Sequence, residues 1–260
     1  MYTVNNFLKV AASGGSERIE TIMEKKEMLY EGKAKKVYKT DNENCYIVDY
    51  KDDATAFNGK KKGTIAGKGV INNRMSNYLM SLMEKEGIPT HFVEELSERE
   101  TVVKKVKIVP LEVIIRNIAA GSFSKRFGVE EGSTLRNATL EYCLKDDALD
   151  DPMINDYQIT AIGAATKEDL ETIADLTFKI NDFLKAYFLK LNIELVDFKI
   201  EFGKTPDGKI ILADEISPDT CRLWDATTHA KLDKDRFRRD LGDVEEAYIE
   251  VAKRMGLIGE

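Results

Sequence analysis

The sequence predicts a mixed α+β protein of two lobes with a cleft between them. Three features of the residue pattern predict this fold class. Short β-like runs separated by turn residues come first in the chain, and a segment with helical spacing interrupts them. The second half holds a long capped helix, then a charged strand pair, then a closing helical segment.

Length and composition limit the class of protein further. The chain has 260 residues, 43% of them hydrophobic, which is enough for a packed core in one large domain or two small ones. Acidic side chains number 46 against 39 basic ones, so the formal net charge is −7. Because binding to nucleic acid requires a basic face, this balance argues against a general nucleic-acid binder.

The cysteine, histidine and apolar patterns indicate a cytoplasmic protein. The three cysteines lie far apart and form no CxxC pair, which argues against a disulfide framework or a structural zinc site. With only two histidines, any metal should be a hard cation held by carboxylates, Mg²⁺ above all. No apolar run approaches the roughly 18 residues of a membrane span, and Lys9 interrupts the short N-terminal apolar patch, unlike in a signal peptide.

Residues 1–22 stand apart as a leader with a small polar stretch typical of flexible chain. The first lobe, residues 23–107, is predicted to be β-rich. Its single helix carries apolar residues at helical spacing and stops at a Gly-Ile-Pro sequence. The predicted elements are strands at 28–40, 45–50, 91–95 and 101–107, a loop at 52–67 and a helix at 69–86.

The second, larger lobe comprises residues 108–260, after a boundary near the proline at position 110. Thr166 and Asp169 have the spacing of a capping box at the start of its long helix. The strand pair that follows is joined by a Thr-Pro-Asp-Gly turn. The predicted elements are a strand at 111–118, a helix at 166–191, strands at 193–202 and 209–215, and a helix at 233–255.

The strand at 193–202 is the most informative segment of the chain. Since a strand alternates its faces, Asp197, Lys199 and Glu201 share one face. The opposite face is apolar and is predicted to enter the core through Val196, Phe198, Ile200 and Phe202. A solvated surface strand with cross-strand ion pairs explains this pattern equally well.

The returning strand delivers Asp214 and Glu215 beside that charged face. A two-residue turn would set Asp214 opposite Glu201, whereas a bulged turn would set Glu215 opposite Lys199. In either register, carboxylates cluster, and carboxylates repel one another unless a cation lies between them. Oxygen donors of this kind, together with phosphate, usually hold Mg²⁺.

Two further segments suggest anion binding. Arg116 stands in an apolar strand and needs a partner, and Gly121 and Ser122 open a short helix after it. Asp219 and Arg222 follow the predicted metal-binding carboxylates, and the guanidinium of Arg222 has the fork geometry that binds phosphate. Two plainer interpretations stay open, a serine N-cap at position 122 and a local Asp219–Arg222 pair.

Several segments, in one order along the chain, resemble a single family. They are Glu31-Gly32-Lys33-Ala34-Lys35, Arg116-Asn117 with Ala120-Gly121-Ser122, Val196-Asp197-Phe198-Lys199 with Glu201, and Asp214-Glu215 with Ser217-Pro218-Asp219 and Arg222. The chain is similar in them to the phosphoribosylaminoimidazole-succinocarboxamide synthase (SAICAR synthetase) family of de novo purine biosynthesis. The likeness runs from about residue 28 to residue 256.

The resemblance implies a two-lobed fold akin to ATP-grasp enzymes and protein kinases, with antiparallel sheets and flanking helices. It implies an ATP-dependent ligase that joins the carboxylate of carboxyaminoimidazole ribonucleotide (CAIR) to the amine of L-aspartate. The products would be SAICAR, ADP and phosphate. Because a carboxylate is a poor acyl donor, ATP would first activate it as an acyl phosphate, which requires positioning and charge neutralisation. A homodimer is also expected from the resemblance.

The resemblance also assigns site residues. The ATP site would comprise Lys33, Ala34, Lys35, Val37, Val106, Ile108, Lys199 and Glu201. Mg²⁺ would be held by Glu201 and Asp214. The ribonucleotide would be bound by Arg116, Ser122, Asp197, Asp219 and Arg222, with its phosphate at Ser122 and Arg222. Lys199 and Asp197 are the catalytic candidates.

The site for L-aspartate is not defined by the motifs; its candidates are Lys125, Arg126 and Lys145. Asn58 stands in a loop where many family members carry Asp. Two other functions remain open. A small-molecule kinase on the same scaffold would consume ATP without aspartate, and a non-catalytic nucleotide-binding module would bind ATP without turnover.

Overall fold

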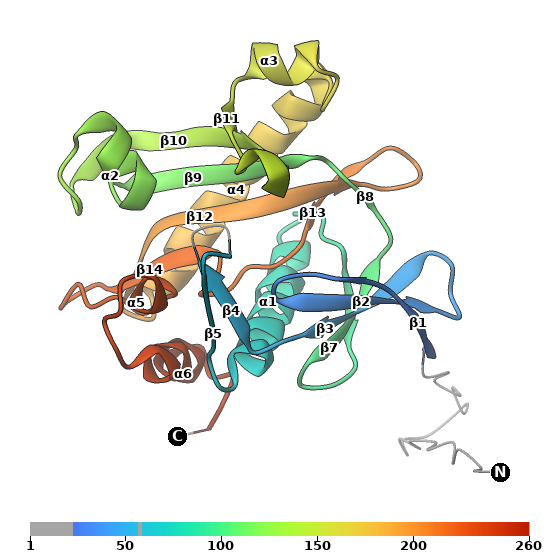
Figure 1. Ribbon diagram of the computed structural model, residues 1–260, viewed down its shortest axis with the longest axis horizontal. Helices are drawn as coiled ribbons and strands as arrows, with labels where there is room; N and C mark the ends of the chain where they lie inside the picture. The colour runs from blue at the N-terminus through green and yellow to red at the C-terminus, as the bar shows by residue number, and fades with distance from the viewer. Residues whose placement is uncertain (1–22, 57–58, 260) are drawn as a thin grey trace.

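The structure is a computed structural model that describes residues 23–56 and 59–259. It contains two main sheets of antiparallel strands, one of five and one of seven strands, with helices packed on them, and a separate two-stranded hairpin (Figure 1). The predicted mixed α+β class is thus confirmed. The predicted leader, residues 1–22, and Asn58 lie outside the described residues.

The smaller sheet contains five strands from the first part of the chain. Its order in space is β1-β2-β3-β7-β6, and each neighbouring pair is antiparallel. These strands correspond to the four β-like segments predicted there, the first of which forms a hairpin. Their bounds are β1 Lys25–Glu31, β2 Lys35–Thr40, β3 Cys45–Tyr50, β6 Phe92–Glu95 and β7 Glu100–Lys104.

A separate hairpin occupies the segment predicted as a loop. Strands β4 (Asp53–Ala56) and β5 (Lys61–Thr64) pair with each other. Ala54 and Ile65 are buried in a cluster with Tyr248 of the C-terminal helix α6 (Val244–Arg254). The loop prediction at residues 52–67 is therefore wrong, because packing against a distant helix stabilises strands that local propensity does not indicate.

Helix α1 (Lys68–Lys85) confirms the helix predicted at residues 69–86. It lies between the two sheets (Figure 1). Met75, Leu79 and Met83 of this helix are fully buried in the main core cluster, as their helical spacing indicates.

The larger sheet is centred on one long strand, β12. Its order is β11-β10-β9-β12-β13, and β14 and β8 also pair with β12. Short elements connect these strands, among them α2 (Gly121–Phe127), a 3₁₀ turn (Asp147–Leu149) and α3 (Asp156–Ala161). The strand bounds are β8 Lys107–Ile108, β9 Leu111–Ile118, β10 Thr134–Leu144, β11 Met153–Ile154, β12 Ile193–Lys204, β13 Ile210–Ala213 and β14 Cys221–Asp225.

Helix α4 (Lys167–Leu189) covers one face of the larger sheet (Figure 1). The predicted capping box is present, since Thr166 Oγ1 accepts from the Asp169 amide and the Asp169 carboxylate accepts from the Thr166 amide. Its fully buried face contributes Ile173, Ile180, Leu184 and Phe188 to the main core.

Strand β12 follows the predicted alternation with one exception. Phe198, Ile200 and Phe202 enter the main core, but Val196 lies in a separate cluster with Trp224. The reason is a register shift between Leu195 and Asp197 in the pairing with β14, which changes the face that Val196 occupies. The assignment of Val196 to the same core face as Phe198 is therefore wrong.

The β12–β13 register decides between the two turns considered for this strand pair. Glu201 pairs with Ala213, which is the register of the bulged turn. The pairing ends at Ala213, however, before Glu215 could face Lys199. Asp214 has a left-handed φ of 62°, and instead of Glu215 the Thr220 carbonyl accepts from the Lys199 amide at 2.9 Å.

The C-terminal segment contains two helices where one was predicted. Helix α5 (Asp235–Arg238) ends early, and α6 begins at Val244. Asp240, Gly242 and Asp243, which lie between them, all have positive φ values, which a continuous helix cannot accommodate. The single helix predicted at 233–255 is therefore wrong.

The two sheets are joined through the segment before β6. Leu212 of β13 donates its amide to the Pro89 carbonyl at 2.9 Å, and its carbonyl accepts from the His91 amide at 2.8 Å. The short strand β8 pairs with β12, so Lys107 contacts the larger sheet even though the predicted boundary assigns it to the first lobe. The boundary itself stays a prediction.

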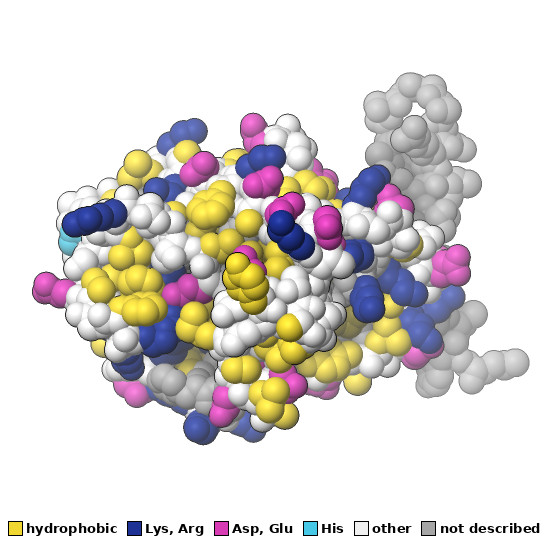
Figure 2. Space-filling view, turned by 90° about the horizontal axis from the view of Figure 1, so that it is seen from above, with side chains coloured by type: hydrophobic (Ala, Val, Ile, Leu, Met, Phe, Trp, Pro, Cys, Tyr) yellow, Lys and Arg dark blue, Asp and Glu magenta, His cyan; other side chains and the backbone are white. Residues whose placement is uncertain are grey.

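Two surface properties bear on the expected partners. Within the described part of the chain, no helix is long and apolar enough to cross a membrane. Lys and Arg side chains are mixed with Asp and Glu over the face shown in Figure 2, which carries no extended basic surface.

His91 should make stability depend on pH. The side chain is 8% exposed, and burial lowers the pKa of its imidazole to about 4. The unfolded chain binds a proton near pH 6.5 while the folded chain stays neutral, so stability is lost as the pH falls from about 6.5 towards 4, by roughly 3 kcal/mol.

A His91→Gln variant should lose this component, which thermal unfolding of both proteins between pH 4 and 7 would measure. His229 is exposed, so His229→Gln should keep the slope of the unchanged chain. Equal slopes for the unchanged chain and His91→Gln would contradict the assignment.

Candidate active site

A cavity of about 780 Å³ lies between the two sheets. The β1–β2 hairpin and strands β3 and β7 contribute its wall on one side, and β12 with the residues after β13 contributes the other. The hairpin is closed by a hydrogen bond from the Gly32 amide to the Lys35 carbonyl at 2.8 Å. All eight residues predicted for ATP line this cavity, namely Lys33, Ala34, Lys35, Val37, Val106, Ile108, Lys199 and Glu201.

One end of the cavity is apolar. Val37, Val48 and Val103 line it together with Val106. Val106 lies directly over Gly203 of β12, where an added Cβ would be 2.3 Å from its Cγ2. Gly203 therefore allows the chain between the two sheets to approach β12 closely. An apolar lining of this kind suits a planar ring.

The other end of the cavity is charged, and its lysines contact its carboxylates. Lys35 Nζ is 2.5 Å from Asp214 Oδ1 and 3.0 Å from Glu215 Oε1. Lys145 Nζ is 2.5 Å from Glu201 Oε1, and Lys199 pairs with Glu112 of β9. The lysines can thus exchange these carboxylates for phosphate oxygens, because both are anionic oxygen acceptors.

Burial and neighbouring charge together set the pKa values here. Burial raises the pKa of Glu201, and the adjacent negative charge of Asp214 raises it further. For Asp214, burial acts in the same direction, but Lys35 outweighs it and the pKa is lowered. For Lys35, burial lowers the pKa, yet Asp214 and Glu215 hold it well above the usual value. The site therefore holds a charged Lys35 beside Asp214, and Asp214 in turn repels Glu201.

Glu201 and Asp214 fit a hard cation by their chemistry, since both supply carboxylate oxygens and each raises the cost of ionising the other. They do not form a complete site. Among residues 23–56 and 59–259, no group of three or more His, Cys, Asp or Glu side chains is arranged to hold a metal. The remaining oxygens would have to come from phosphate and water.

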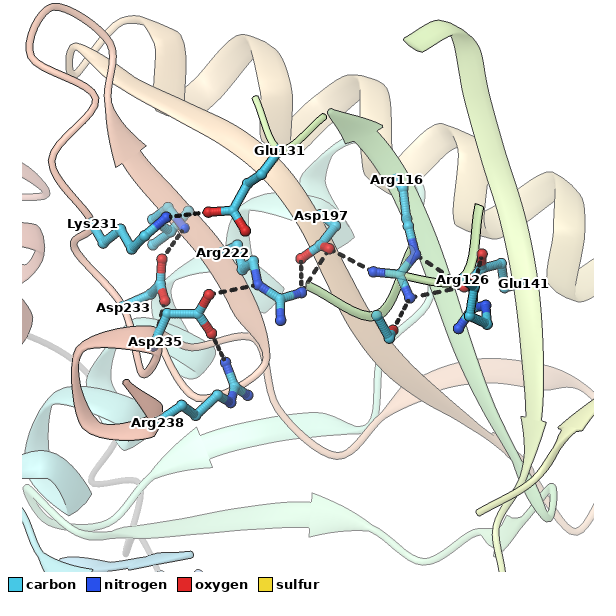
Figure 3. A network of polar contacts seen from close by, with 12 residues as sticks. Arg116, Arg126, Glu131, Glu141, Asp197, Arg222, Lys231, Asp233, Asp235 and Arg238 are labelled. Atoms are coloured by element: carbon cyan, nitrogen blue, oxygen red, sulfur yellow. Dashed lines mark hydrogen bonds and ion pairs between the residues drawn. The ribbon is translucent and has the colours of Figure 1, made fainter. Parts of the chain in front are cut away.

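A charged row crosses four neighbouring strands beside the cavity (Figure 3). It consists of Glu141 on β10, Arg116 on β9, Asp197 on β12 and Arg222 on β14. Asp197 Oδ2 accepts from Arg116 Nη1 at 2.7 Å and from Arg222 Nη1 at 2.8 Å. The partner that a buried Arg116 needs is thus present on both sides.

Ser122 extends this row. Its Oγ accepts from Arg116 Nη2 at 3.1 Å, while the N-cap of α2 is Ala120. The N-cap interpretation of Ser122 is therefore wrong. Gly121 has a positive φ, and a Cβ there would lie 2.4 Å from Arg222 Nη2. Only glycine lets the start of α2 lie against the Arg222 guanidinium.

Asp219 lies apart from the row and lines the cavity. Its carboxylate accepts from Lys68 Nζ at 2.9 Å and Lys234 Nζ at 3.2 Å, and also from the Tyr248 hydroxyl. The local Asp219–Arg222 pair is not formed, because Arg222 bonds Asp197 and Asp235 instead. Of the five residues predicted for the ribonucleotide, only Asp219 lines the cavity, and Arg116, Ser122, Asp197 and Arg222 form one group next to it.

The sequence did not reveal the residues that hold Asp219 and the charged row in place. Glu141, Asp235, Lys68 and Tyr248 are partners of predicted residues but belong to distant segments. Only Glu141 had a signal in the sequence. A buried Arg116 requires an anionic partner, which a carboxylate on a strand next to β9 could supply. Of the L-aspartate candidates, Arg126 pairs with Glu141, Lys145 pairs with Glu201, and Lys125 is exposed.

Comparisons with known proteins identify the family. The family model described as SAICAR synthetase matches residues 28–255. The phosphoribosylaminoimidazole-succinocarboxamide synthase of Lachnoclostridium phytofermentans is 67% identical over 235 residues, 90% of this chain and 100% of that protein. The protein of the same name from Thermoanaerobacter sp. is 63% identical over 234 residues, 90% of this chain and 99% of its own.

Solved structures show the same likeness. The phosphoribosylaminoimidazole-succinocarboxamide synthase of Ehrlichia chaffeensis matches with a TM-score of 0.88 and 47% identity, over 90% of this chain and 100% of that one. A SAICAR synthetase in complex with ADP matches with a TM-score of 0.87 and 46% identity, over 90% of this chain and 99% of that one. The chain belongs to the SAICAR synthetase family, as its motifs predict.

Proposed function

We propose that this chain is an ATP-dependent ligase of purine biosynthesis that joins CAIR to L-aspartate and forms SAICAR, ADP and phosphate. The observation that carries the proposal is the cavity in which lysines face paired carboxylates, next to a row with two arginines. The first part suits a nucleoside triphosphate, and the second suits a phosphate ester. The match to a relative solved with ADP supports the nucleotide assignment.

In this proposal, the adenine ring occupies the apolar end of the cavity around Val37, Val106 and Ile108. Lys33, Lys35 and Lys199 contact phosphate oxygens, and Glu201 and Asp214 hold Mg²⁺. The metal supplies charge neutralisation at the transferring phosphoryl group. Lys35 contacts Asp214 in this structure. In the proposal, the ammonium group of Lys35 moves from this carboxylate to a phosphate oxygen when the nucleotide binds.

The ribonucleotide is proposed to bind at Arg116, Ser122, Asp197, Asp219 and Arg222. Its carboxylate oxygen attacks the γ-phosphorus of ATP and ADP leaves, which gives an acyl phosphate. The aspartate amine then attacks the acyl carbon, phosphate leaves, and the amine proton passes to solvent or phosphate. Lys199 neutralises the developing phosphoryl charge, and Asp197 orients the ribonucleotide through the two arginines.

The remaining expectations belong to the same proposal. We place the enzyme in the cytoplasm, since its three cysteines are free, and expect a homodimer. Large apolar side chains stay exposed around α3, on the face that Figure 2 presents, and a dimer interface could cover them. They are Leu149, Met153, Tyr157 and Ile162.

The proposal is tested by measuring ADP release with Mg-ATP and CAIR, with and without L-aspartate. Release that requires both CAIR and aspartate, with SAICAR as product, is the expected result. Aspartate-independent release with a phosphorylated product would instead identify a kinase. ATP binding without any release would identify a binding module.

Asp214→Asn should lower kcat by roughly 100-fold or more and should remove its dependence on Mg²⁺ concentration, because a carboxamide is a poor ligand for a hard cation. Asp207→Asn is the matched control, since Asp207 is exposed and pairs with Lys209 in the β12–β13 turn. Circular dichroism should show both variants folded. Normal turnover of Asp214→Asn would exclude the metal assignment.

A further inference from the structure

Glu141 completes the charged row from its outer side. On β10, Thr139 pairs directly with Arg116 of β9, so Glu141, two residues further along, lies on the same face as Arg116. On the other side of β9, Asp197 pairs directly with Arg116. The guanidinium of Arg116 therefore lies between two carboxylates that come from two different neighbouring strands (Figure 3).

Glu141 binds one edge of that guanidinium. Its Oε2 accepts from Arg116 Nε at 2.9 Å and from Arg116 Nη2 at 2.8 Å. Its Oε1 accepts from Arg126 Nη2 at 2.5 Å. Arg116 is 2% exposed and Glu141 is 8% exposed, so both charges depend on this pairing.

The contact with Glu141 fixes where the rest of the guanidinium points. Nη1 donates to Asp197 Oδ2, and Nη2, which also binds Glu141, donates to Ser122 Oγ through its second N–H. An arginine has five N–H donors, and these contacts engage four of them. Without Glu141, the Nε edge would lose its acceptor, and the guanidinium could turn fully onto Asp197, which Arg222 also uses.

We propose that Glu141 is a positioning residue for the ribonucleotide site, which orients Arg116 towards the phosphate ester without touching the substrate. This inference rests on the proposed function. A direct contact is disfavoured, because both carboxylate oxygens are already bonded to arginines and the carboxylate would repel an anion.

Charge alone makes the opposite prediction, which gives the test a clear sign. Removing the negative charge of Glu141 makes the surroundings of Arg116 more positive. If Glu141 acted only through its charge, its neutralisation would strengthen the binding of an anion. If Glu141 positions Arg116, the same change weakens that binding.

The test is Glu141→Gln, with steady-state kinetics for CAIR and for ATP. We expect the KM for CAIR to rise about tenfold, because Arg116 loses a charged acceptor at its Nε edge. The kcat and the KM for ATP should change less than about threefold, since the cavity lysines do not contact Glu141. Glu141→Asp keeps the charge and should restore part of the affinity for CAIR.

Glu131→Gln is the matched control. Glu131 also bridges two cations, with Oε1 2.9 Å from Lys231 Nζ and Oε2 2.5 Å from Arg239 Nη2, but neither cation contacts Arg116. Its removal should leave the KM for CAIR unchanged. A similar rise in both variants would show a general charge effect and would overturn the proposal.

An unchanged or lower KM for CAIR in folded Glu141→Gln would also overturn the proposal, as would equal losses for CAIR and ATP. If Glu141→Gln does not fold, the test rests on Glu141→Asp alone, and an unchanged KM for CAIR in Glu141→Asp overturns the proposal.

The Arg116→Ala variant distinguishes failure of the positioning role from failure of the proposed function. Normal CAIR kinetics in that variant would reject the ribonucleotide site itself, whereas a raised KM there with a normal Glu141→Gln would reject only the positioning role.

Discussion

The alternation of strand β12 is the constraint on which the rest of the structure depends. One face of this strand places Phe198, Ile200 and Phe202 in the main core. The other places Asp197 in the charged row and Lys199 and Glu201 at the cavity. Because successive side chains must point to opposite faces, burying the apolar set fixes the charged set, and a slip of one residue would reverse both. Core packing thus determines the geometry of the site.

That arrangement buries many charged side chains. These buried charges pair with oppositely charged side chains from other segments of the chain. Lys68, with no exposed side chain, pairs with Asp219, and Arg116 pairs with Asp197 and Glu141. Pairing costs desolvation, so these contacts are weak evidence for extra stability. Their effect is on position, since a buried charge with two partners from different strands has few orientations open to it.

The segments that could be predicted from sequence are those whose cause is local. The alternation of β12, the spacing of α1 and the capping box at Thr166 each depend on residues a few positions apart. The turn between β12 and β13 could also be predicted from local residues, although the sequence did not decide between its two possible registers.

The errors have non-local causes. The β4–β5 hairpin depends on packing against Tyr248, almost two hundred positions later in the sequence. Val196 changes face because of a register shift in the pairing of β12 with β14. The residue pattern within one strand does not indicate the register of its pairing with a neighbouring strand. Glu141 was missed for the same reason, since its role follows from the pairing of β10 with β9. The candidate residues themselves were found from motifs, while the partners that orient them required the fold.

One short connection ties the cavity to the charged row. The chain leaves the sheet after Ala213 and returns at Cys221, and in between it supplies Asp214 and Asp219 to the cavity. The next residue after the return is Arg222, whose guanidinium belongs to the row.

This connection is held at several points along its length. The Ser76 hydroxyl bonds both the amide and the carbonyl of Ile216, and the Thr220 carbonyl bonds the Lys199 amide. Asp219 is anchored by Lys68 and by Tyr248. A connection fixed in this way keeps the charged end of the cavity and the guanidinium of Arg222 at a set separation. The proposed reaction, which brings a carboxylate to a γ-phosphate, would require that its two anionic substrates be held at such a separation.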